Sequence, residues 1–407
     1  MKLSYINENP LDALDYCERI VNDGSRSKFT EKYLPQKTGN PFTCERFYIS
    51  VLKCSSENLL KFGTLPNFCI DSFADNAIYV HPDLVYYYPD YKIVKTKQEV
   101  TPTSSSRSVK VLTKPYYIKL CYPDRIGRIT RELDDRHIYS SLEVTERFER
   151  ICQSNNTTDK FAFMPEYGGV LFSDSNTKIG LVIRNQKFVG KNSNSVYSMI
   201  PGFSLFSTDR RCTSDEPLLL QLIEKVSGRY NKHEYILNQF CYPLIDVFFN
   251  CVIQEGIIPE LHSQNVIFGF DKNWDVKSII IRDLESHDKD VTLMRRLGKT
   301  AKLNSYPFKC IDESQYNYAI KHSFMFDHKL GEYFIEEIIK VVANKENEVF
   351  INLCREVRKY VLNKFGSFIK DNHFFPDDGK WYKFKDVIID RTQISRPYVT
   401  FDNPLFR

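Results

Sequence analysis

The sequence predicts a mixed α+β protein, with antiparallel strands over residues 62–200 and helices dominating after residue 215. Residues 62–91 are aromatic and punctuated by proline, which is typical of short strands and loops. Residues 216–255 carry apolar residues at helical spacing, as expected for helices that pack on both sides. The 407 residues are too many for one compact core, so we expect two or three subdomains.

The composition is that of a globular protein in a reducing compartment. Hydrophobic residues make up 42% and charged residues 27% of the chain, and the net charge of +4 is too small to indicate a nucleic-acid partner. The 11 cysteines are irregularly spaced and form no Cys-x-x-Cys pair, which argues against a disulfide framework or a structural zinc site. We find no signal peptide and no apolar run near the roughly 20 residues that span a bilayer, so we expect a cytoplasmic protein without a membrane partner.

The chain is organised around a predicted hairpin within residues 255–285, EGIIPELHSQNVIFGFDKNWDVKSIIIRDLE. Two runs rich in β-branched and aromatic residues, 265–270 and 276–281, flank a turn-like Asp-Lys-Asn sequence. Such an arrangement predicts two antiparallel strands joined by a short connection.

Polar side chains lie at both ends of this hairpin. Because strand residues alternate between faces, we expect Glu260, His262 and Gln264 to share one face, and Asp283 and Glu285 to share another. Carboxylates, an imidazole and amides in one place suit a nucleotide with its metal better than a protein core. The alternative is a polar hairpin whose histidine and amide side chains only satisfy local backbone groups.

Two basic residues upstream are candidates for binding phosphate. Hydroxyl side chains surround Arg107 in the segment TPTSSSRSVKVL, and clustered hydroxyls with a guanidinium can hold phosphate oxygens. A serine-rich linker is the alternative. Lys119 lies in an otherwise apolar strand, and because a buried lysine needs an anionic partner, we expect its side chain to point inward.

A strand–turn–strand unit at residues 161–185 carries two prominent charges, Glu166 and Arg184. A structural ion pair is the simplest interpretation of either residue. By residue type alone, Arg184 could also clamp a substrate carboxylate.

Three of these segments together resemble the aerobactin-synthetase-like family of siderophore synthetases, which act independently of non-ribosomal peptide synthetases. The first is PTSSSRS at 102–108, and the third combines ELHSQNVIF with IIIRDLE. The second is YIKL with the arginine after IGRIT, so that Arg107, Lys119 and Arg131 follow one another at steps of twelve residues. The order and spacing of the three are similar to that family's ATP-binding pattern.

The resemblance implies an enzyme that adenylates a carboxylic acid, citrate or a derivative, with ATP and Mg²⁺. It would then condense the acyl-adenylate with an amine or hydroxyl to give an amide or ester, releasing AMP and pyrophosphate. The implied architecture is an antiparallel, β-rich ATP-binding part and a mainly helical C-terminal part with a cleft between them. It divides into a shortened thumb-like region (1–98), a fingers-like region (99–212) and a palm-like region (213–407) that carries the hairpin.

Carried over by position, the resemblance also implies roles for single residues. Asp283 and Glu285 would bind the metal, and Arg184 remains the candidate for substrate binding. Catalysis would fall to Arg107, Lys119, Arg131 and His262. The nucleotide-binding set would be Ser105, Arg107, Ser108, Lys119, Arg131, Glu260, His262, Gln264, Asn265 and Asp283.

The residue types fit this chemistry on their own terms. A carboxylate is already ionised at neutral pH, so adenylation mainly requires cations that stabilise charge on the α-phosphate and the leaving pyrophosphate. In the second step, His262 or a carboxylate such as Glu260 could accept the proton of the nucleophile.

Departures from the family leave other functions open. Only about 100 residues precede PTSSSRS, fewer than in the family. This shortening would mean a different substrate, a partner chain that supplies the missing part, or a degenerate member that only binds a ligand or a subunit. A homodimer is also compatible, since dimers are frequent in the family. A kinase-like phosphotransferase is the weaker alternative, because kinases place an aspartate where this chain has Gln264 and no glycine-rich phosphate loop occurs upstream.

Overall fold

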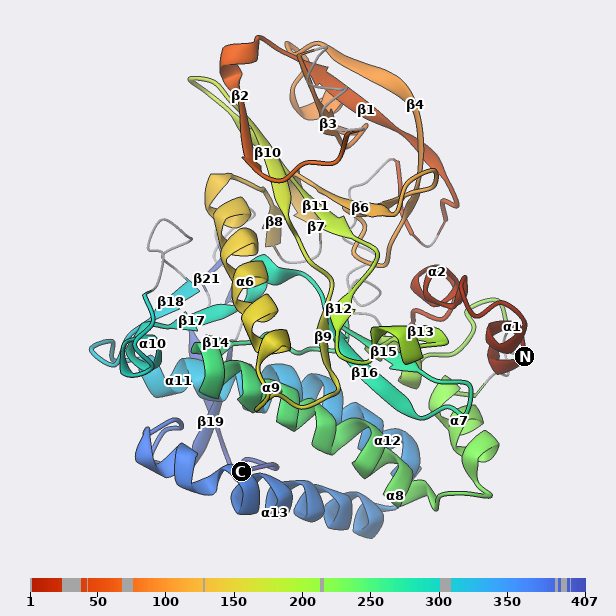
Figure 1. The fold of residues 1–407 in the computed structure, drawn as a ribbon, viewed down its shortest axis with the longest axis vertical. Coiled ribbons are helices and arrows are strands. Elements are labelled where there is room, and N and C mark those ends of the chain that lie inside the picture. The colour runs from red at the N-terminus through yellow and green to blue at the C-terminus, as the bar shows by residue number, and fades with distance from the viewer. Residues whose placement is uncertain are drawn as a thin grey trace.

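The protein has an upper part built on a large sheet and a lower part in which a smaller sheet is surrounded by helices (Figure 1). This arrangement confirms the α+β fold class. The computed structural model describes residues 2–23, 38–41, 43–67, 76–126, 129–212, 216–300, 309–384, 387–388, 394–395 and 397–407.

The upper sheet has eight strands within the described ranges, and every neighbouring pair is antiparallel. Its buried apolar side chains form a core of their own, separate from the main core of the lower part. In spatial order the strands are β2 (Leu59–Gly63), β10 (Gly168–Ser173), β11 (Lys178–Asn185), β6 (Tyr116–Leu120), β5 (Ser108–Val111), β4 (Ile93–Pro102), β1 (Phe47–Lys53) and β3 (Ala77–Val80).

The lower sheet contains the predicted hairpin. Strands β15 (Val266–Phe270) and β16 (Val276–Ile281) pair antiparallel, which confirms the hairpin, while β16 pairs in parallel with β9 (Phe161–Phe163). In order this sheet consists of β12 (Val189–Gly190), β9 (Phe161–Phe163), β16 (Val276–Ile281), β15 (Val266–Phe270) and β13 (Ser198–Pro201). A short three-stranded sheet has the order β14 (Ile257–Ile258), β17 (Asp288–Asp290) and β18 (Cys310–Ile311). Two-stranded pairs complete the described strands: β7 (Tyr122–Ile126) with β8 (Ile129–Arg131), β19 (Lys380–Phe384) with β22 (Tyr398–Asp402), and β20 (Val387–Ile388) with β21 (Ile394–Ser395).

Helices cover the lower sheet, and α6 (Asp135–Gln153) runs from the upper part down to it (Figure 1). The π-helical segment η5 (Leu237–Cys241) continues α8 (Lys232–Ile236), and the π-helical segment η8 (Phe324–Ile335) continues α11 (Tyr318–Ser323). The α-helices are α1 (Lys2–Glu8), α2 (Ala13–Arg19), α5 (Leu84–Tyr87), α6 (Asp135–Gln153), α7 (Leu218–Val226), α8 (Lys232–Ile236), α9 (Tyr242–Glu255), α10 (Val291–Arg296), α11 (Tyr318–Ser323), α12 (Glu336–Ala343) and α13 (Asn347–Asp371).

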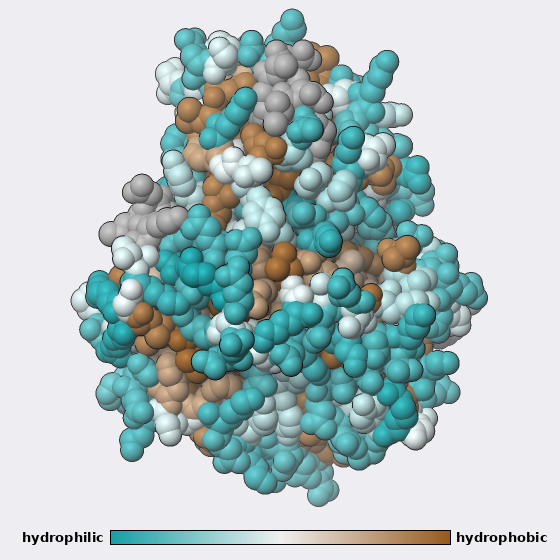
Figure 2. Space-filling view, viewed as in Figure 1, coloured by the Kyte–Doolittle hydropathy of each residue, from teal (hydrophilic) through white to brown (hydrophobic). Residues whose placement is uncertain are grey.

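One continuous helical stretch, Lys232–Glu255, is long and apolar enough to cross a membrane by length and composition alone. Most of this stretch is buried inside the protein, and α9 packs in the main hydrophobic core. The stretch therefore has the position of a core helix. Figure 2 shows a mainly hydrophilic face of the protein, with hydrophobic side chains in separate groups.

One local expectation was wrong. The segment Glu260–Asn265 is a loop with a turn, not a strand, so the alternation predicted for Glu260, His262 and Gln264 does not exist. Its polar side chains instead make local hydrogen bonds that favour a turn over a sheet ladder. The three-region division stays a prediction, and the upper sheet takes strands from both sides of residue 98.

Gly256 ends α9 in the left-handed conformation, with φ at 64°, as expected for a C-terminal glycine. A Cβ at this position would lie 2.8 Å from Cγ of Met294 and 3.1 Å from the carbonyl oxygen of Asp290. We predict that Gly256→Ala lowers the free energy of unfolding by roughly 1–3 kcal/mol. Gly228→Ala is the matched control, because a Cβ there meets no atom within 4 Å. Equal denaturant midpoints for the two variants would contradict the prediction.

Candidate active site

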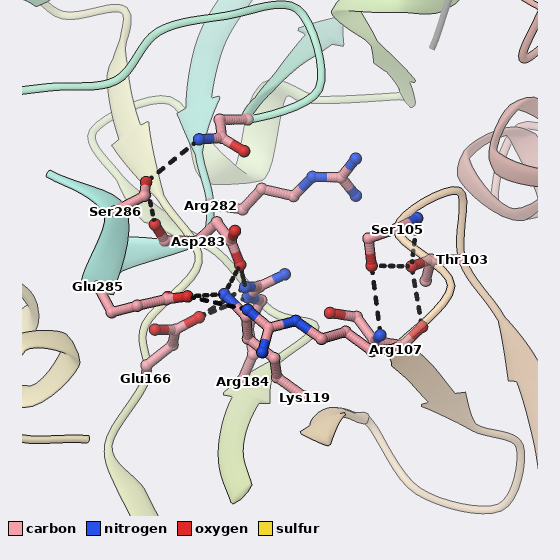
Figure 3. Close-up of polar contacts among 12 residues, drawn as sticks. Thr103, Ser105, Arg107, Lys119, Glu166, Arg184, Arg282, Asp283, Glu285 and Ser286 are labelled. Carbon is pink, nitrogen blue, oxygen red and sulfur yellow. Dashed lines mark hydrogen bonds and ion pairs between the residues drawn. The ribbon is translucent and has the colours of Figure 1, made fainter. Parts of the chain in front are cut away.

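The register of the upper sheet brings polar side chains to one face. Lys119 on β6 is directly opposite Ser108 on β5 and Val182 on β11. Arg184 lies two residues beyond Val182, so it points to the same face as Lys119. Arg107 precedes β5 and joins them from the loop, so three of the predicted cations, Arg107, Lys119 and Arg184, converge on one side of the sheet (Figure 3).

Lys119 is the centre of the site. Only 2% of the residue is exposed, and its ammonium group contacts the carboxylates of Asp283 and Glu285. A guanidinium nitrogen of Arg107 lies 3.6 Å from Oε1 of the same Glu285. This confirms the expectation that Lys119 points inward to an anionic partner.

Arg184 joins the same cluster from β11. Its Nε and Nη2 donate to Oε1 of Glu166 at 2.8 and 2.6 Å, and Nη2 also donates to Oδ1 of Asp283 at 2.8 Å. Glu166 and Asp283 meet because β9 and β16 run in parallel and each carboxylate follows the end of its strand. Arg184 is therefore in an ion pair, and its predicted contact with a substrate carboxylate stays a prediction.

The metal candidates Asp283 and Glu285 come together through a turn and not by strand alternation. Asp283 is left-handed, with φ at 72°, and Glu285 lies in the 3-10 turn Leu284–Ser286. A non-glycine residue with positive φ is uncommon and persists only when its surroundings hold it. The turn directs both carboxylates to Lys119, as Figure 3 shows, while Arg282 points away from them.

The charges of the cluster set its protonation states. Burial alone would raise the pKa of Asp283, but Lys119, Arg184 and Arg107 hold that pKa well below its usual value. At Glu166 burial prevails, and it raises the pKa above the usual 4.5 although Arg184 opposes it. The site therefore pairs a carboxylate that stays ionised with one that holds its proton more tightly.

The serine-rich segment is a closed turn and not a solvated linker. The Thr103 hydroxyl donates to the carbonyl oxygen of Ser108 at 2.9 Å and lies 3.0 Å from Oγ of Ser105. That Ser105 hydroxyl accepts from the backbone N–H of Ser108 at 3.2 Å. Arg107 donates to the carbonyl oxygen of Arg131 at 2.9 Å, so the structure brings Arg131 to the site through its backbone.

His262, Gln264 and Asn265 line the loop before β15. Nδ1 of His262 accepts from the backbone N–H of Gln264 at 3.2 Å, and its Nε2 lies 3.9 Å from Oε2 of Glu260. The Asn265 amide donates to the carbonyl oxygen of Glu260 at 3.1 Å and to Oγ of Ser286 at 3.2 Å. These contacts match the open alternative that some polar residues satisfy local groups, and they also tie this loop to the turn after β16.

The cluster contains a set of oxygen atoms suited to a hard cation. Ligand atoms of Glu166, Asp283 and Glu285 lie within 4.8 Å of one another. Within the described residues, Oε2 of Glu166 and Oε2 of Glu285 are buried and accept no hydrogen bond. Mg²⁺ prefers carboxylate oxygens, so these residues fit it, and Glu166 adds a third carboxylate to the predicted pair.

The two cavities described for this structure lie outside the cluster. One of about 450 Å³ is lined by residues that include Lys160 and Tyr360, and one of about 370 Å³ by residues that include His373 and Arg407. None of the predicted site residues lines either one. At the predicted cleft, the ion pairs of Lys119 join the upper sheet to the turn after the hairpin.

The sequence did not predict the positions of three residues in or beside the site. Glu166 was interpreted only as a member of a structural ion pair. Arg282 stands beside Asp283 in the hairpin sequence and was given no role, yet its Nε donates to the carbonyl oxygen of Gln264 at 2.8 Å. Glu18, on α2, contacts Arg282. The two residues are far apart in the sequence, and no motif around Glu18 predicts this contact.

Comparison with known proteins tests the resemblance to a known family that the sequence motifs indicate. Residues 91–201 match the model of the IucA / IucC family. The structure is similar to petrobactin biosynthesis protein AsbB from Bacillus anthracis str. Sterne, with a TM-score of 0.67, 14% identity, and coverage of 94% of this chain and 73% of that one. It is also similar to ATP-bound aerobactin synthetase IucA (TM-score 0.64, 15% identity, 91% and 73% covered) and to IucC (0.62, 12%, 82% and 66%), both from a hypervirulent pathotype of Klebsiella pneumoniae. No curated protein sequence matches the chain.

These findings confirm the resemblance to the aerobactin-synthetase-like family. The sequence match includes the serine-rich turn, Lys119 and Arg184, whereas the hairpin lies beyond it. The comparison of folds extends over 94% of the chain.

Lys119→Met tests the ion cluster. The variant leaves Asp283 and Glu285 without their central cation, and removing one partner of a buried ion pair costs about 3–5 kcal/mol of stability. We predict a loss of that size in urea unfolding at neutral pH, and a smaller loss at acidic pH, where protonation neutralises the carboxylates. Lys178→Met is the control, because its ion pair with Asp135 is largely exposed and is worth under about 1 kcal/mol. Similar losses in both variants would contradict the prediction.

Proposed function

We propose that this chain is an ATP-dependent synthetase of the siderophore type, which adenylates a carboxylic acid and condenses it with an amine or hydroxyl. Citrate or a derivative is the acid that the family resemblance favours. The observation that carries the proposal is the cluster in which Arg107, Lys119 and Arg184 face three carboxylates beside the serine-rich turn. The likeness of the chain to synthetases, one of which was solved with ATP bound, supports the same reaction.

In the first half-reaction, an oxygen of the substrate carboxylate attacks the α-phosphorus of ATP. The new bond forms as the bond from the α-phosphorus to the bridging oxygen breaks, and pyrophosphate leaves. Negative charge develops on non-bridging and leaving oxygens, where cations lower the barrier. We assign this role to Arg107 and Lys119, with Arg131 as a third cation, and we assign phosphate hydrogen bonds to the hydroxyls of Ser105 and Ser108.

Asp283 and Glu285, with Glu166, are the residues that we propose hold Mg²⁺, which neutralises phosphate charge when bound. The pairing in the free protein supports this assignment. Lys119 and Arg184 neutralise the same carboxylates that would receive the metal. With a nucleotide bound, Lys119 and Arg107 would turn to phosphate oxygens, and the carboxylates would hold the metal in place of these cations.

In the second half-reaction, the nucleophile attacks the acyl carbon, the acyl–oxygen bond to the phosphate breaks, and AMP leaves. Two expected bases are weak here. Nδ1 of His262 accepts a backbone hydrogen bond, so in the neutral ring Nε2 carries the proton and no lone pair is left to take one from the nucleophile. Burial alone would raise the pKa of Glu260, but the ammonium group of Lys329 holds that pKa well below its usual value. We therefore propose that His262 is a donor to the nucleotide or acid, that an amine attacks in its neutral form, and that the proton released from its nitrogen passes to solvent water.

The remaining assignments rest on the same proposal. Glu260, Gln264 and Asn265 would complete the nucleotide site from the loop before β15, and the predicted cleft would open between the cluster and this loop. Arg184 would bind the acid's carboxylate once Asp283 turns to the metal. We propose a cytoplasmic enzyme that acts on small molecules, as a homodimer or with a partner subunit.

Product analysis tests the reaction. We expect the protein with ATP, Mg²⁺, citrate and excess hydroxylamine to form AMP and pyrophosphate in a citrate-dependent way. Arg107→Ala and His262→Ala should lower the rate by at least roughly 100-fold, because each removes a charged or polar contact made in the transition state. Arg229→Ala is the control, since its exposed ion pair with Asp275 lies outside the proposed site.

The products discriminate between the alternatives. ADP in place of AMP would contradict the synthetase and favour a kinase-like phosphotransferase. If a panel of carboxylic acids yields no AMP although calorimetry detects ATP binding, the chain is a binding subunit. If ATP does not bind at all, the proposed function is wrong.

A pH titration tests the proposed metal ligands. Metal binding requires ionised carboxylates, and burial raises the pKa of Glu166 above 4.5, so its proton must leave before it can bind. We predict that Mg²⁺ affinity, measured calorimetrically with ATP at saturation, rises with pH by up to about tenfold per unit until Glu166 is ionised. Glu166→Gln should lower the affinity and flatten this dependence. An unchanged slope in the variant would exclude Glu166 as a ligand.

A further inference from the structure

The carboxylate of Glu18, on α2, contacts two segments of the candidate active site at once. Its Oε2 accepts a hydrogen bond from the backbone N–H of Ser104 at 2.8 Å, within the serine-rich turn. Its Oε1 contacts Nη1 of Arg282, which directly precedes Asp283. A helix near the N-terminus is thereby joined to both halves of the site.

Glu18 is only 2% exposed. A buried carboxylate is costly unless it is paired and hydrogen-bonded, and both oxygens of Glu18 have a partner. Arg282 extends the connection, because its Nε donates to the carbonyl oxygen of Gln264 at 2.8 Å. Glu18 and Arg282 therefore connect three segments through hydrogen bonds and an ion pair. These segments are the serine-rich turn, the loop before β15 and the start of the turn that carries Asp283.

Helix α2 is itself held firmly against the lower part. The hydroxyl of Tyr16 donates to Oδ2 of Asp209 at 2.8 Å, and Oγ of Ser204 donates to the carbonyl oxygen of Val21 at 2.7 Å. Leu14, one turn before Glu18, packs in a small core that includes residues of β6 and of both hairpin strands. The Glu18 carboxylate thus projects from a fixed support.

The turn that Glu18 contacts has a conformation that needs such support. The backbone of Ser106 is in the left-handed conformation, with φ at 68°, which is unfavourable for residues other than glycine. Such a residue persists where surrounding contacts determine the backbone. The Ser104 amide lies two residues before it, so the bond to Glu18 acts on this strained part of the turn.

We propose that Glu18 is a positioning residue that holds the serine-rich turn and Arg282 in the arrangement that receives the nucleotide phosphates. The inference rests on the proposed function, because it concerns the same nucleotide site. Glu18 acts through Ser104 and Arg282 and touches no reacting atom. It gives α2 a part in nucleotide binding that no sequence motif indicates.

Glu18→Gln tests the proposal. Glutamine has the size of glutamate, but its single oxygen can accept from only one of the two donors, and Arg282 loses its counterion. We expect the Kd for Mg²⁺-ATP and the KM for ATP to rise about 10- to 100-fold, as for a lost charged hydrogen bond, with the KM for the acid unchanged. Asp15→Asn is the matched control, because Asp15 lies on the same helix and pairs with Lys110 without contacting the turn or Arg282. The control should leave all three constants unchanged.

A second measurement does not depend on the nucleotide. Hydrogen exchange of the peptide that contains residues 103–108, in the free protein, should become faster in Glu18→Gln and stay unchanged in Asp15→Asn. If Glu18 is merely structural, the melting temperature falls while the two Michaelis constants stay unchanged or rise together.

These outcomes separate the inference from the proposed function. Unchanged exchange in Glu18→Gln overturns the positioning role whether or not ATP binds. Faster exchange with an unchanged Kd for ATP also overturns it. If the unaltered protein binds no ATP, the proposed function fails and the nucleotide-binding role of Glu18 fails with it, while the exchange data still decide whether Glu18 holds the turn.

Discussion

A lysine in the middle of an apolar strand cannot be left without an anion, and this requirement joins the two parts of the molecule. Lys119 belongs to the upper sheet, whereas Asp283 and Glu285 follow the hairpin of the lower sheet. Because a buried charge costs several kcal/mol when unpaired, the two sheets are stable only in a relative position that brings these groups together. Arg184 and Glu166 add a second pair across the same junction.

The same groups that stabilise the free protein suit a polyanion with a divalent cation. Under the proposed function, the cations of the cluster would pair with phosphate oxygens and the carboxylates with magnesium, so each internal ion pair would be replaced by an external one. Each buried charge would then keep a partner of opposite sign. Helix α2 contributes to this arrangement from outside the cluster, through the contacts of Glu18 with the serine-rich turn and Arg282.

Local pattern was sufficient to predict the elements that depend on near neighbours in sequence. The inward orientation of Lys119 followed from its apolar strand, and the hairpin from two runs rich in β-branched residues around a turn. The loop at Glu260–Asn265 was predicted wrongly, because alternation assumes an extended chain and this segment turns through local hydrogen bonds. The roles of Glu166 and Glu18 were not predictable, since they depend on a parallel strand pair and on helix docking between distant segments.

The parallel pairing of β9 with β16 has a kinetic consequence. These strands are far apart in sequence, and their register brings Glu166 beside Asp283. Closing so long a loop is entropically unfavourable, so non-local pairings of this kind form slowly compared with hairpins and helices. During synthesis, the upper sheet can be completed well before the hairpin leaves the ribosome. Lys119 would then stay solvated and unpaired until the last third of the chain supplies Asp283 and Glu285, whereas Glu166, the other partner of Arg184, is already present.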